Sequence, residues 1–456
     1  MKRISRLLVL LLSVAILCTA LVVITSAEGT TFDLASAISN AKDGDTITMT
    51  GNATLTTSVN VNKNLTIDLG GYNLTFKTAD AFVINTASVD LTICGSGKII
   101  TGGVIANVNA SDSDFSIVGD SVADRINIVY DGSVQQRMLT VGANSNGNIT
   151  FKNTSVVSKY HPDAMTKDGE VILAEGTPKL SFTNFDFLCD VKYTGKITNT
   201  DKAQSFVCVY FLKMAGDSRL AIKDSSINTT GGGVIIDGPF AETSSDVIVS
   251  VENSALRTIS YDGLTRAMAF YSGGMYDKPA QSRGTVLIKD SVIETTYAIF
   301  NGGLEATNFV PESLEPSTVF EFQNSTVAIT SVNCENSEHY TTSRGGTLRF
   351  DSTSKLATPG ASSLGVNINQ ANAGFCFAEG ARISTGSTTD FYNSNNVKFP
   401  DGTTAKSSTT YRLVFDPAGD PFYPWVVVKL VDGKLPEGVN DVSADLEFGK
   451  DFWYSD

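Results

Sequence analysis

The sequence has little histidine, tryptophan, proline and basic charge, and these shortages exclude several classes of protein. Its 456 residues contain 2 histidines, 2 tryptophans and 12 prolines. With only His161 and His339 present, a His-based metal site is not expected, and no Cys/His spacing suits zinc. We therefore predict no metal site and no bound cofactor.

Cysteine is also scarce, and its spacing argues against a disulfide framework. Beyond residues 1–27, which contain Cys18, an odd number of cysteines remains, widely spaced among apolar neighbours. We predict that each is a small buried hydrophobe in a strand: Cys94, Cys189, Cys208, Cys334 and Cys376.

Residues 1–27 have the pattern of a signal peptide. Three basic residues at the start precede an apolar stretch from Leu7 to Ile24, and small residues at Thr25-Ser26-Ala27 suit cleavage. An uncleaved anchor is the alternative, since the run is long enough to span a bilayer. Cleavage would leave 31 Lys+Arg (34 − 3) against 48 Asp+Glu, a net charge of −17.

An acidic chain of this kind is a poor match for nucleic acid or anionic lipid. No later stretch is apolar and long enough to span a bilayer. We therefore expect a protein that is secreted or held at the cell surface, with no nucleic-acid partner and no membrane contact after cleavage.

Hydrophobic periodicity changes once along the chain. Residues 32–42, FDLASAISNAK, place Leu34, Ile38 and Ala41 on one face of a helix, and Gly44 follows where a C-terminal cap belongs. From Ile47 onward the period is two, which is typical of strands. In NLTIDLGGYNLTF (64–76), two glycines separate two such strands.

A phrase then repeats: an alternating apolar triplet, an Asn or Asp, and a second apolar alternation. Aligning the phrases on that Asn or Asp gives positions 153, 184, 224, 253, 290, 324 and 351, separated by 31, 40, 29, 37, 34 and 27 residues. A spacing near thirty that varies by a few residues is typical of a solenoid with loops of unequal length.

Short alternating strands bury too little surface to be stable alone, so each is expected to pair with parallel neighbours in the preceding and following repeats. Asn, Asp and Gly at the corners tolerate left-handed backbone, and stacked Asn side chains can hydrogen-bond between repeats. A propeller or β-sandwich is the alternative. Both need antiparallel hairpins, whose Asn-Gly and Asp-Gly turns are few here.

The helix followed by DGDTITM and NLTIDLGGYNLTF resembles the N-terminal opening of right-handed parallel β-helix proteins of the pectate-lyase-like superfamily, many of them exported by bacteria. The resemblance covers residues 30–100 and continues weakly to about 395. It implies an all-β right-handed parallel β-helix with a short capping helix. The predicted division is a signal peptide (1–27), a capping helix (28–45), the β-helix (46–399) and a C-terminal cap or small antiparallel element (400–456).

Catalytic signatures of this superfamily are mostly missing. Its lyases carry Asp-His and Arg-x-Pro-x-x-Arg motifs with Ca²⁺-binding carboxylates, and its hydrolases use paired carboxylates. Asn199-Thr200-Asp201 matches one hydrolase element, which makes Asp201 a weak catalytic candidate. The segments SDSD (111–114) and DGD (43–45) offer oxygen ligands for Ca²⁺ but lack the spacing of a known loop, so we expect turns.

Three loops carry the remaining candidates. Residues 158–170 and 336–346 bring histidine close to carboxylates and arginine, which suits acid–base chemistry, although solvated loops between repeats would look the same. Residues 261–284 gather aromatic and charged side chains of the kind that bind sugars, although these aromatics would also fill a core. The catalytic candidates are His161, Asp163, Glu338, His339 and Arg344, and the substrate-binding candidates are Tyr261, Arg266, Tyr271 and Tyr276.

Three functions remain open. The leading hypothesis is a non-enzymatic extracellular module whose long lateral face binds glycans or another cell-envelope component. The alternative is a divergent polysaccharide lyase or glycoside hydrolase acting on acidic polysaccharide. A third is a structural unit that assembles with copies of itself.

Overall fold

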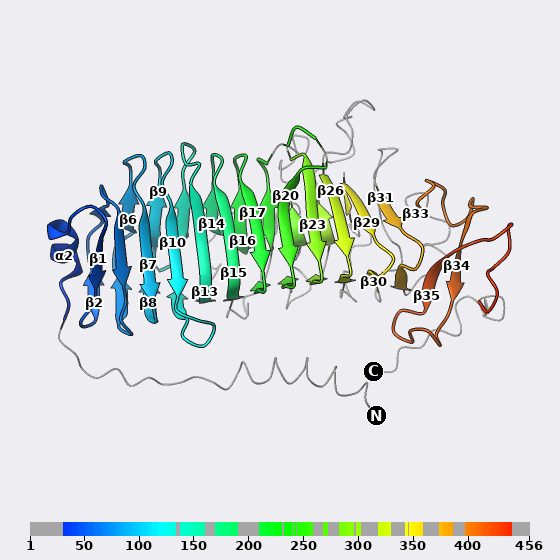
Figure 1. The fold of residues 1–456 in the computed structure, drawn as a ribbon, viewed down its shortest axis with the longest axis horizontal. Coiled ribbons are helices and arrows are strands. Elements are labelled where there is room, and N and C mark those ends of the chain that lie inside the picture. Colours follow the sequence, from blue (N-terminus) through cyan, green and yellow to red (C-terminus); the bar gives the residue numbers. More distant parts are fainter. Residues whose placement is uncertain are drawn as a thin grey trace, which may run out of the picture.

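The computed structural model describes residues 31–133, 137–159, 169–189, 209–229, 232–239, 241–243, 245–258, 268–271, 282–295, 298–301, 318–329, 343–344, 346–358, 374–385 and 397–439. These residues form one short helix and two long, mostly parallel sheets. Strands lie side by side along the long axis in sequence order (Figure 1). The prediction of an all-β fold built from parallel strands is therefore confirmed.

The strands form three ladders, which the chain visits in the order first, second, third before returning to the first. The first ladder consists of β1 (Asp45–Thr48), β4 (Leu65–Asp68), β7 (Leu91–Gly95), β10 (Phe115–Gly119), β13 (Asn148–Ser158), β15 (Lys179–Cys189), β17 (Arg219–Lys223), β20 (Val247–Glu252), β23 (Gly284–Lys289), β26 (Thr318–Gln323), β29 (Gly346–Phe350), β31 (Gly374–Phe377) and β33 (Val397–Lys398).

The second ladder belongs to the same sheet, because β13 and β15 each run through both ladders. Besides the second halves of those two strands, it contains β2 (Ala53–Leu55), β5 (Asn73–Phe76), β8 (Gly97–Thr101), β11 (Ile126–Tyr130), β18 (Ser226–Thr229), β21 (Ala255–Thr258), β24 (Val292–Thr295), β27 (Thr326–Ile329), β30 (Lys355–Thr358) and β32 (Arg382–Thr385).

The third ladder is the second sheet, and all its pairings are parallel. It contains β3 (Val59–Asn60), β6 (Asp80–Ile84), β9 (Val104–Val108), β12 (Leu139–Val141), β14 (Gly169–Ala174), β16 (Val209–Met214), β19 (Val234–Ile236), β22 (Met268–Tyr271), β25 (Ala298–Asn301) and β28 (Ser343–Arg344).

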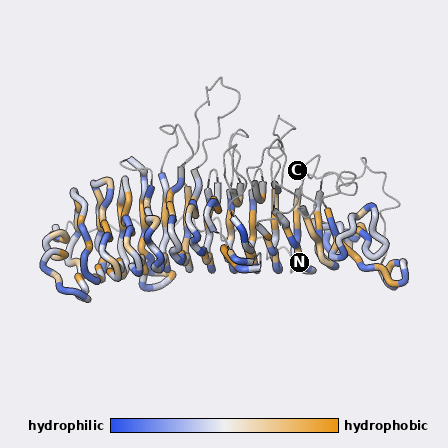
Figure 2. Tube along the Cα trace, turned by 90° about the horizontal axis from the view of Figure 1, so that it is seen from above, coloured by the Kyte–Doolittle hydropathy of each residue, from blue (hydrophilic) through white to orange (hydrophobic). Residues whose placement is uncertain are grey.

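Alternate side chains of each strand face a common core, because side chains along a strand point to opposite faces. Figure 2 shows hydrophobic and hydrophilic residues alternating through successive repeats. Equivalent inward residues stack from repeat to repeat: Ile93, Ile117, Phe151 and Phe182 occupy one row, and all are fully buried. The rings of Phe151 and Phe182 lie parallel with centroids 5.3 Å apart.

The corner between the first two ladders confirms the alignment of the repeated phrase. Six of the seven aligned Asn and Asp residues have left-handed backbone, with φ between 46° and 51°. In the earlier repeats glycines fill this corner, as at Gly70 (φ 56°) and Gly71 (φ 86°). The seventh aligned residue, Asp351, does not have positive φ, so this part of the alignment was wrong.

The corner Asn side chains join neighbouring repeats, as expected. Asn184 Nδ2 donates to Asn153 Oδ1 at 3.0 Å, and Asn324 Nδ2 donates to Asp290 Oδ1 at 2.6 Å. A buried row of serines lies beside this corner. Each serine Oγ accepts a hydrogen bond of 3.0–3.1 Å from the backbone N–H of the ladder residue one repeat earlier, along Ser225, Ser254, Ser291, Ser325 and Ser354.

The single helix in the described part of the chain is α2 (Leu34–Asn40), slightly shorter than the predicted 32–42. Asp33 caps it, since its Oδ1 accepts the N–H of Ser36 at 3.0 Å. Leu34 and Ile38 are buried, as the helical spacing indicated, whereas Ala41 is only partly buried. The helix lies at the β1 and β2 end of the row of strands (Figure 1).

At the opposite end, β34 (Tyr411–Phe415) and β35 (Trp425–Lys429) form an antiparallel pair, and β35 also pairs antiparallel with β32. Two ion pairs fasten this segment to the second ladder. Lys355 Nζ lies 2.7 Å from Asp420 Oδ2, and Arg382 Nη2 lies 2.7 Å from Asp416 Oδ2. The segment thus differs from the parallel repeats that precede it.

The prediction that the cysteines are buried hydrophobes is correct for Cys189 and wrong for two others. Cys189 is 6% exposed and belongs to the core. Cys94 and Cys376 are only partly buried, because they occupy the outward position of their strands. Cys94 and Cys376 are free thiols. Cys208 and Cys334 lie outside the described residues.

Candidate functional site

Most residues singled out in the sequence as catalytic or sugar-binding lie outside the described residues. Tyr271 and Arg344 are placed by their backbones, in β22 and β28 of the third ladder. The pairing register aligns Tyr271 with Asn301 and Asn301 with Arg344, so these positions share one row. The positions outside are His161, Asp163, Asp201, Glu338, His339, Tyr261, Arg266 and Tyr276.

Residues 158, 159, 169 and 170 of the first candidate loop are described, and Glu170 forms an ion pair. Glu170, in β14, accepts a hydrogen bond of 2.8 Å from Arg137 Nε on its Oε1. The Glu170 side chain is only 11% exposed. This carboxylate therefore has a structural partner close to the third ladder.

The aromatic segment 261–284 contributes one described aromatic side chain to the core. Phe270 is fully buried, and its ring centroid lies 5.3 Å from that of Phe320. The core-filling alternative is thus correct for this residue. Residues 261–267 and 272–281 of this segment lie outside the described residues.

The segments considered for Ca²⁺ form corners between repeats. Asp114 Oδ1 accepts the backbone N–H of Asn148 at 2.6 Å, and the N–H of Asp114 donates to Asp90 Oδ1 at 2.9 Å. Asp43 Oδ1 accepts the N–H of Asn64 at 2.8 Å in the same way. Across the described part of the chain, no group of three or more His, Cys, Asp or Glu side chains is placed to hold a metal ion.

Two outward surfaces remain as candidate sites, and sequence inspection missed both. The first is a row of hydroxyls on the first ladder, here called the hydroxyl row. In six successive repeats the same outward position holds Thr or Ser, and all six side chains are at least partly exposed: Thr46, Thr66, Thr92, Ser116, Thr150 and Ser181.

Neighbouring strands are about 4.8 Å apart, so the hydroxyl row is a regularly spaced line of donors and acceptors. The adjacent outward row on the same strands includes Asp68 and Lys152. The signal was visible in the sequence, since these residues stand between the apolar residues of each triplet. Only the register of the ladder shows that they are aligned.

The second surface lies on the second ladder and is here called the β8–β15 face. Four aliphatic side chains, Ile100, Val129, Val157 and Leu188, occupy one outward row in successive repeats. Leu188 is 47% exposed and the others are partly exposed. An outward row of this length without a polar residue is unusual for a solvated sheet face.

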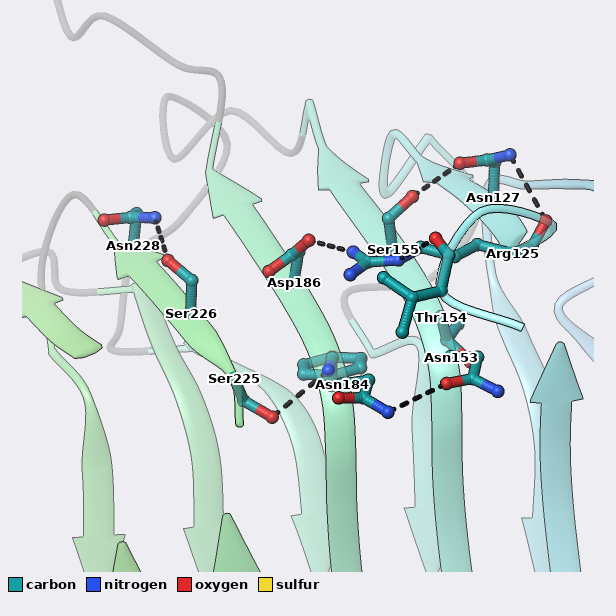
Figure 3. A network of polar contacts seen from close by, with 12 residues as sticks. Arg125, Asn127, Asn153, Thr154, Ser155, Asn184, Asp186, Ser225, Ser226 and Asn228 are labelled. Atoms are coloured by element: carbon teal, nitrogen blue, oxygen red, sulfur yellow. Dashed lines mark hydrogen bonds and ion pairs between the residues drawn. The ribbon is translucent and has the colours of Figure 1, made fainter. Parts of the chain in front are cut away.

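A polar network runs beside this apolar row (Figure 3). Ser155 Oγ donates to Asn127 Oδ1 at 2.6 Å, and Asn127 Nδ2 lies 3.4 Å from the Arg125 carbonyl oxygen. The Arg125 guanidinium crosses to β15 and pairs with Asp186 Oδ2. The polar side chains of this face are therefore held in place by one another.

Comparisons with protein-family models, with curated proteins and with solved structures found no match to this chain. Within the described residues, no helix has the length and apolar character needed to cross a membrane.

Proposed function

We propose that the three ladders are the sides of one right-handed parallel β-helix of the pectate-lyase-like type. Support comes from the order in which the chain visits the ladders, and from the parallel register that advances by one strand per repeat. In this proposal α2 caps the first turn, and the β34–β35 pair caps the last, covering edges that would otherwise pair with other chains. A crystal structure showing two facing antiparallel sheets would contradict it.

We further propose that the protein is exported by its N-terminal segment and acts outside the cell as a non-enzymatic module that binds a glycan along its lateral face. The hydroxyl row is the observation that carries this proposal. Six hydroxyls at the strand spacing, from Thr46 to Ser181, match the needs of an extended polymer that presents hydroxyl groups at regular intervals. Charged neighbours such as Asp68 and Lys152 would orient the chain through stronger hydrogen bonds.

A glycan array tests this function, with reducing-sugar release measured in parallel on acidic polysaccharides. We expect binding without release of reducing ends. The double variant Thr92→Val/Thr150→Val keeps side-chain shape and β-propensity but removes two hydroxyls, and should weaken binding about tenfold or more, given ~1 kcal/mol per hydrogen bond. Thr140→Val, at an outward position of the third ladder, is the matched control.

The outcomes separate the hypotheses. Unchanged binding by the double variant would remove the hydroxyl row from the site. Release of reducing ends would support the alternative, a polysaccharide lyase or glycoside hydrolase. Absence of binding to any glycan would contradict the proposed function.

A further inference from the structure

The apolar row of the β8–β15 face has a polar residue at each of its two ends. In the row that holds Ile100, Val129, Val157 and Leu188, the preceding repeat contributes Thr75 and the following repeat contributes Asn228. Beyond Asn228 the row continues with Arg257 and Glu294, whose side chains pair at 3.1 Å. The apolar stretch therefore covers four repeats with polar residues at both ends, an arrangement typical of a protein interface with an apolar centre and a polar rim.

Charged residues flank the apolar row in a specific order. On one side, the outward row contains Lys98, Asn127, Ser155 and Asp186 in successive repeats. On the other side, Asp131 and Lys159 directly follow β11 and β13 and are both exposed. The N–H of Lys159 donates to the carbonyl oxygen of Tyr130, which keeps these two positions in neighbouring repeats.

This order is self-complementary under a half-turn. The relevant two-fold axis lies in the plane of contact, runs parallel to the strands and passes midway between Val129 and Val157. Rotation about this axis places β11 of one copy opposite β13 of the other, and β8 opposite β15. The resulting pairs are Val129 with Val157, Ile100 with Leu188, Lys98 with Asp186, Asp131 with Lys159, and Asn127 with Ser155.

Among the described residues, each charged residue of the two flanking rows thus meets an opposite charge, and each aliphatic residue of the apolar row meets an aliphatic one. A two-fold axis along the length of the molecule would keep aliphatic contacts, with Ile100 and Leu188 each opposite its own copy, but it would lose the charge pairs, because Lys98 would lie opposite Gly102. A closed two-fold dimer requires a self-complementary patch, and the first arrangement provides one.

We propose that the β8–β15 face is the interface of a two-fold homodimer in which the long axes of the two copies run in opposite directions. Local charge favours the association although the whole chain carries a formal charge of −14. The face itself holds Lys98, Lys159 and Arg125 against Asp131 and Asp186, so it adds little repulsion. The Asp186 side chain remains 29% exposed while it pairs with Arg125, which leaves it accessible to Lys98 of the second copy.

Sedimentation velocity over a concentration series tests the dimer with the purified protein. The wild type should dimerise reversibly, and Leu188→Asp should raise the dimer dissociation constant at least tenfold, because it buries a charge opposite Ile100. Leu188 is already exposed, so folding should be unaffected and far-UV circular dichroism should not change. Val247→Asp, at a position 44% exposed on β20, is the matched control and should leave the dimer intact.

Charge reversal and cross-linking test the arrangement within the dimer. Asp131→Lys and Lys159→Asp should each weaken the dimer about tenfold, and the double exchange should restore it, since both contacts again join opposite charges. Mixing Ile100→Cys with Leu188→Cys should give a disulfide between the two new cysteines, identified by peptide mass spectrometry, that neither variant forms alone.

Three outcomes would overturn the proposal: a wild-type monomer at every concentration from micromolar to millimolar, a dimer indifferent to Leu188→Asp, or cross-linking of Ile100→Cys with itself. The result is independent of glycan binding, since the hydroxyl row lies on a different ladder. Loss of glycan binding with an intact dimer, or the reverse, would distinguish failure of one proposal from failure of the other.

Discussion

Asn253 Nδ2 donates a hydrogen bond of 2.6 Å to Oδ1 of Asp224, one repeat earlier, and both residues have left-handed backbone, with φ of 46° and 51°. The same side chain thus fits a strained corner and joins two repeats. Asn and Asp are the non-glycine residues that adopt this conformation most readily, and their short polar side chains reach the neighbouring corner.

The corner predicts different effects for two substitutions of Asn253. Asn253→Gly loses the side-chain hydrogen bond but keeps the backbone conformation, and should cost about 1 kcal/mol of unfolding free energy. Asn253→Ala also forces an alanine into left-handed backbone, which costs roughly 1 kcal/mol more. Urea denaturation of the two variants measures the difference. Asn60→Ala, on an exposed position of β3, is the control, and equal stability of the Gly and Ala variants would contradict the argument.

The buried row of serines predicts a larger loss of unfolding free energy, although the substitution removes only one hydroxyl group. Ser291 Oγ accepts the N–H of Ser254 at 3.1 Å and donates to the Lys289 carbonyl oxygen at 2.6 Å. Ser291 is 3% exposed, so Ser291→Ala leaves a buried N–H without its acceptor and should cost about 1–3 kcal/mol. Hydrogen exchange should show faster exchange at the Ser254 amide. Ser250→Ala, on an outward position of β20, should change neither measurement.

Much of this corner could be predicted from the sequence, because the repeated phrase shows which residue must turn. The alignment was wrong at Asp351 for a physical reason. In the repeats at 224, 253, 290 and 324 the serine follows the Asn or Asp directly, whereas Ser354 follows Asp351 by three residues, so this corner is longer. Asp351 there accepts hydrogen bonds from Thr353 N–H and Ser354 Oγ instead of adopting positive φ.

The surfaces could not be predicted to the same degree. Val129 and Val157 look like core residues in the sequence, since an aliphatic residue in a strand carries no mark of the face it occupies. Only the register shows that they are partly exposed and aligned. Cys94 and Cys376 were assigned to the core for the same reason, and alternation places them outward.

The ion pairs that fasten the β34–β35 segment predict a local loss of stability. Lys355 Nζ lies 2.7 Å from Asp420 Oδ2, and Asp420 Oδ1 also accepts the N–H groups of Phe422 and Tyr423. Asp420→Asn should weaken the contact by about 1–2 kcal/mol, because a hydrogen bond to a charged group contributes about 1.5–3 kcal/mol and a neutral one about 0.5–1.5 kcal/mol. Hydrogen exchange of β34 and β35 should accelerate while β7 and β10 stay unchanged. Asp432→Asn, exposed near the end of the same segment, is the control.

Acidification should destabilise the C-terminal end of the molecule. Burial acts to raise the pKa of Asp351 and of Asp420. The hydrogen bonds from Ser354 and Thr353 to Asp351, and from Lys355 to Asp420, outweigh it, so both pKa values fall below the ordinary 3.8. A lowered pKa in the folded state contributes stability that is complete above pH 3.8, decreases as the pH falls through the folded-state pKa, and is absent below it.

Thermal unfolding followed from pH 6 to about pH 2 should therefore show a loss of stability confined to the region below pH 3.8. Asp351→Asn should flatten that loss, because the residue no longer binds a proton on unfolding. If Asp351→Asn and the wild type lose stability in parallel over this range, these carboxylates do not control the acid sensitivity of the C-terminal repeats.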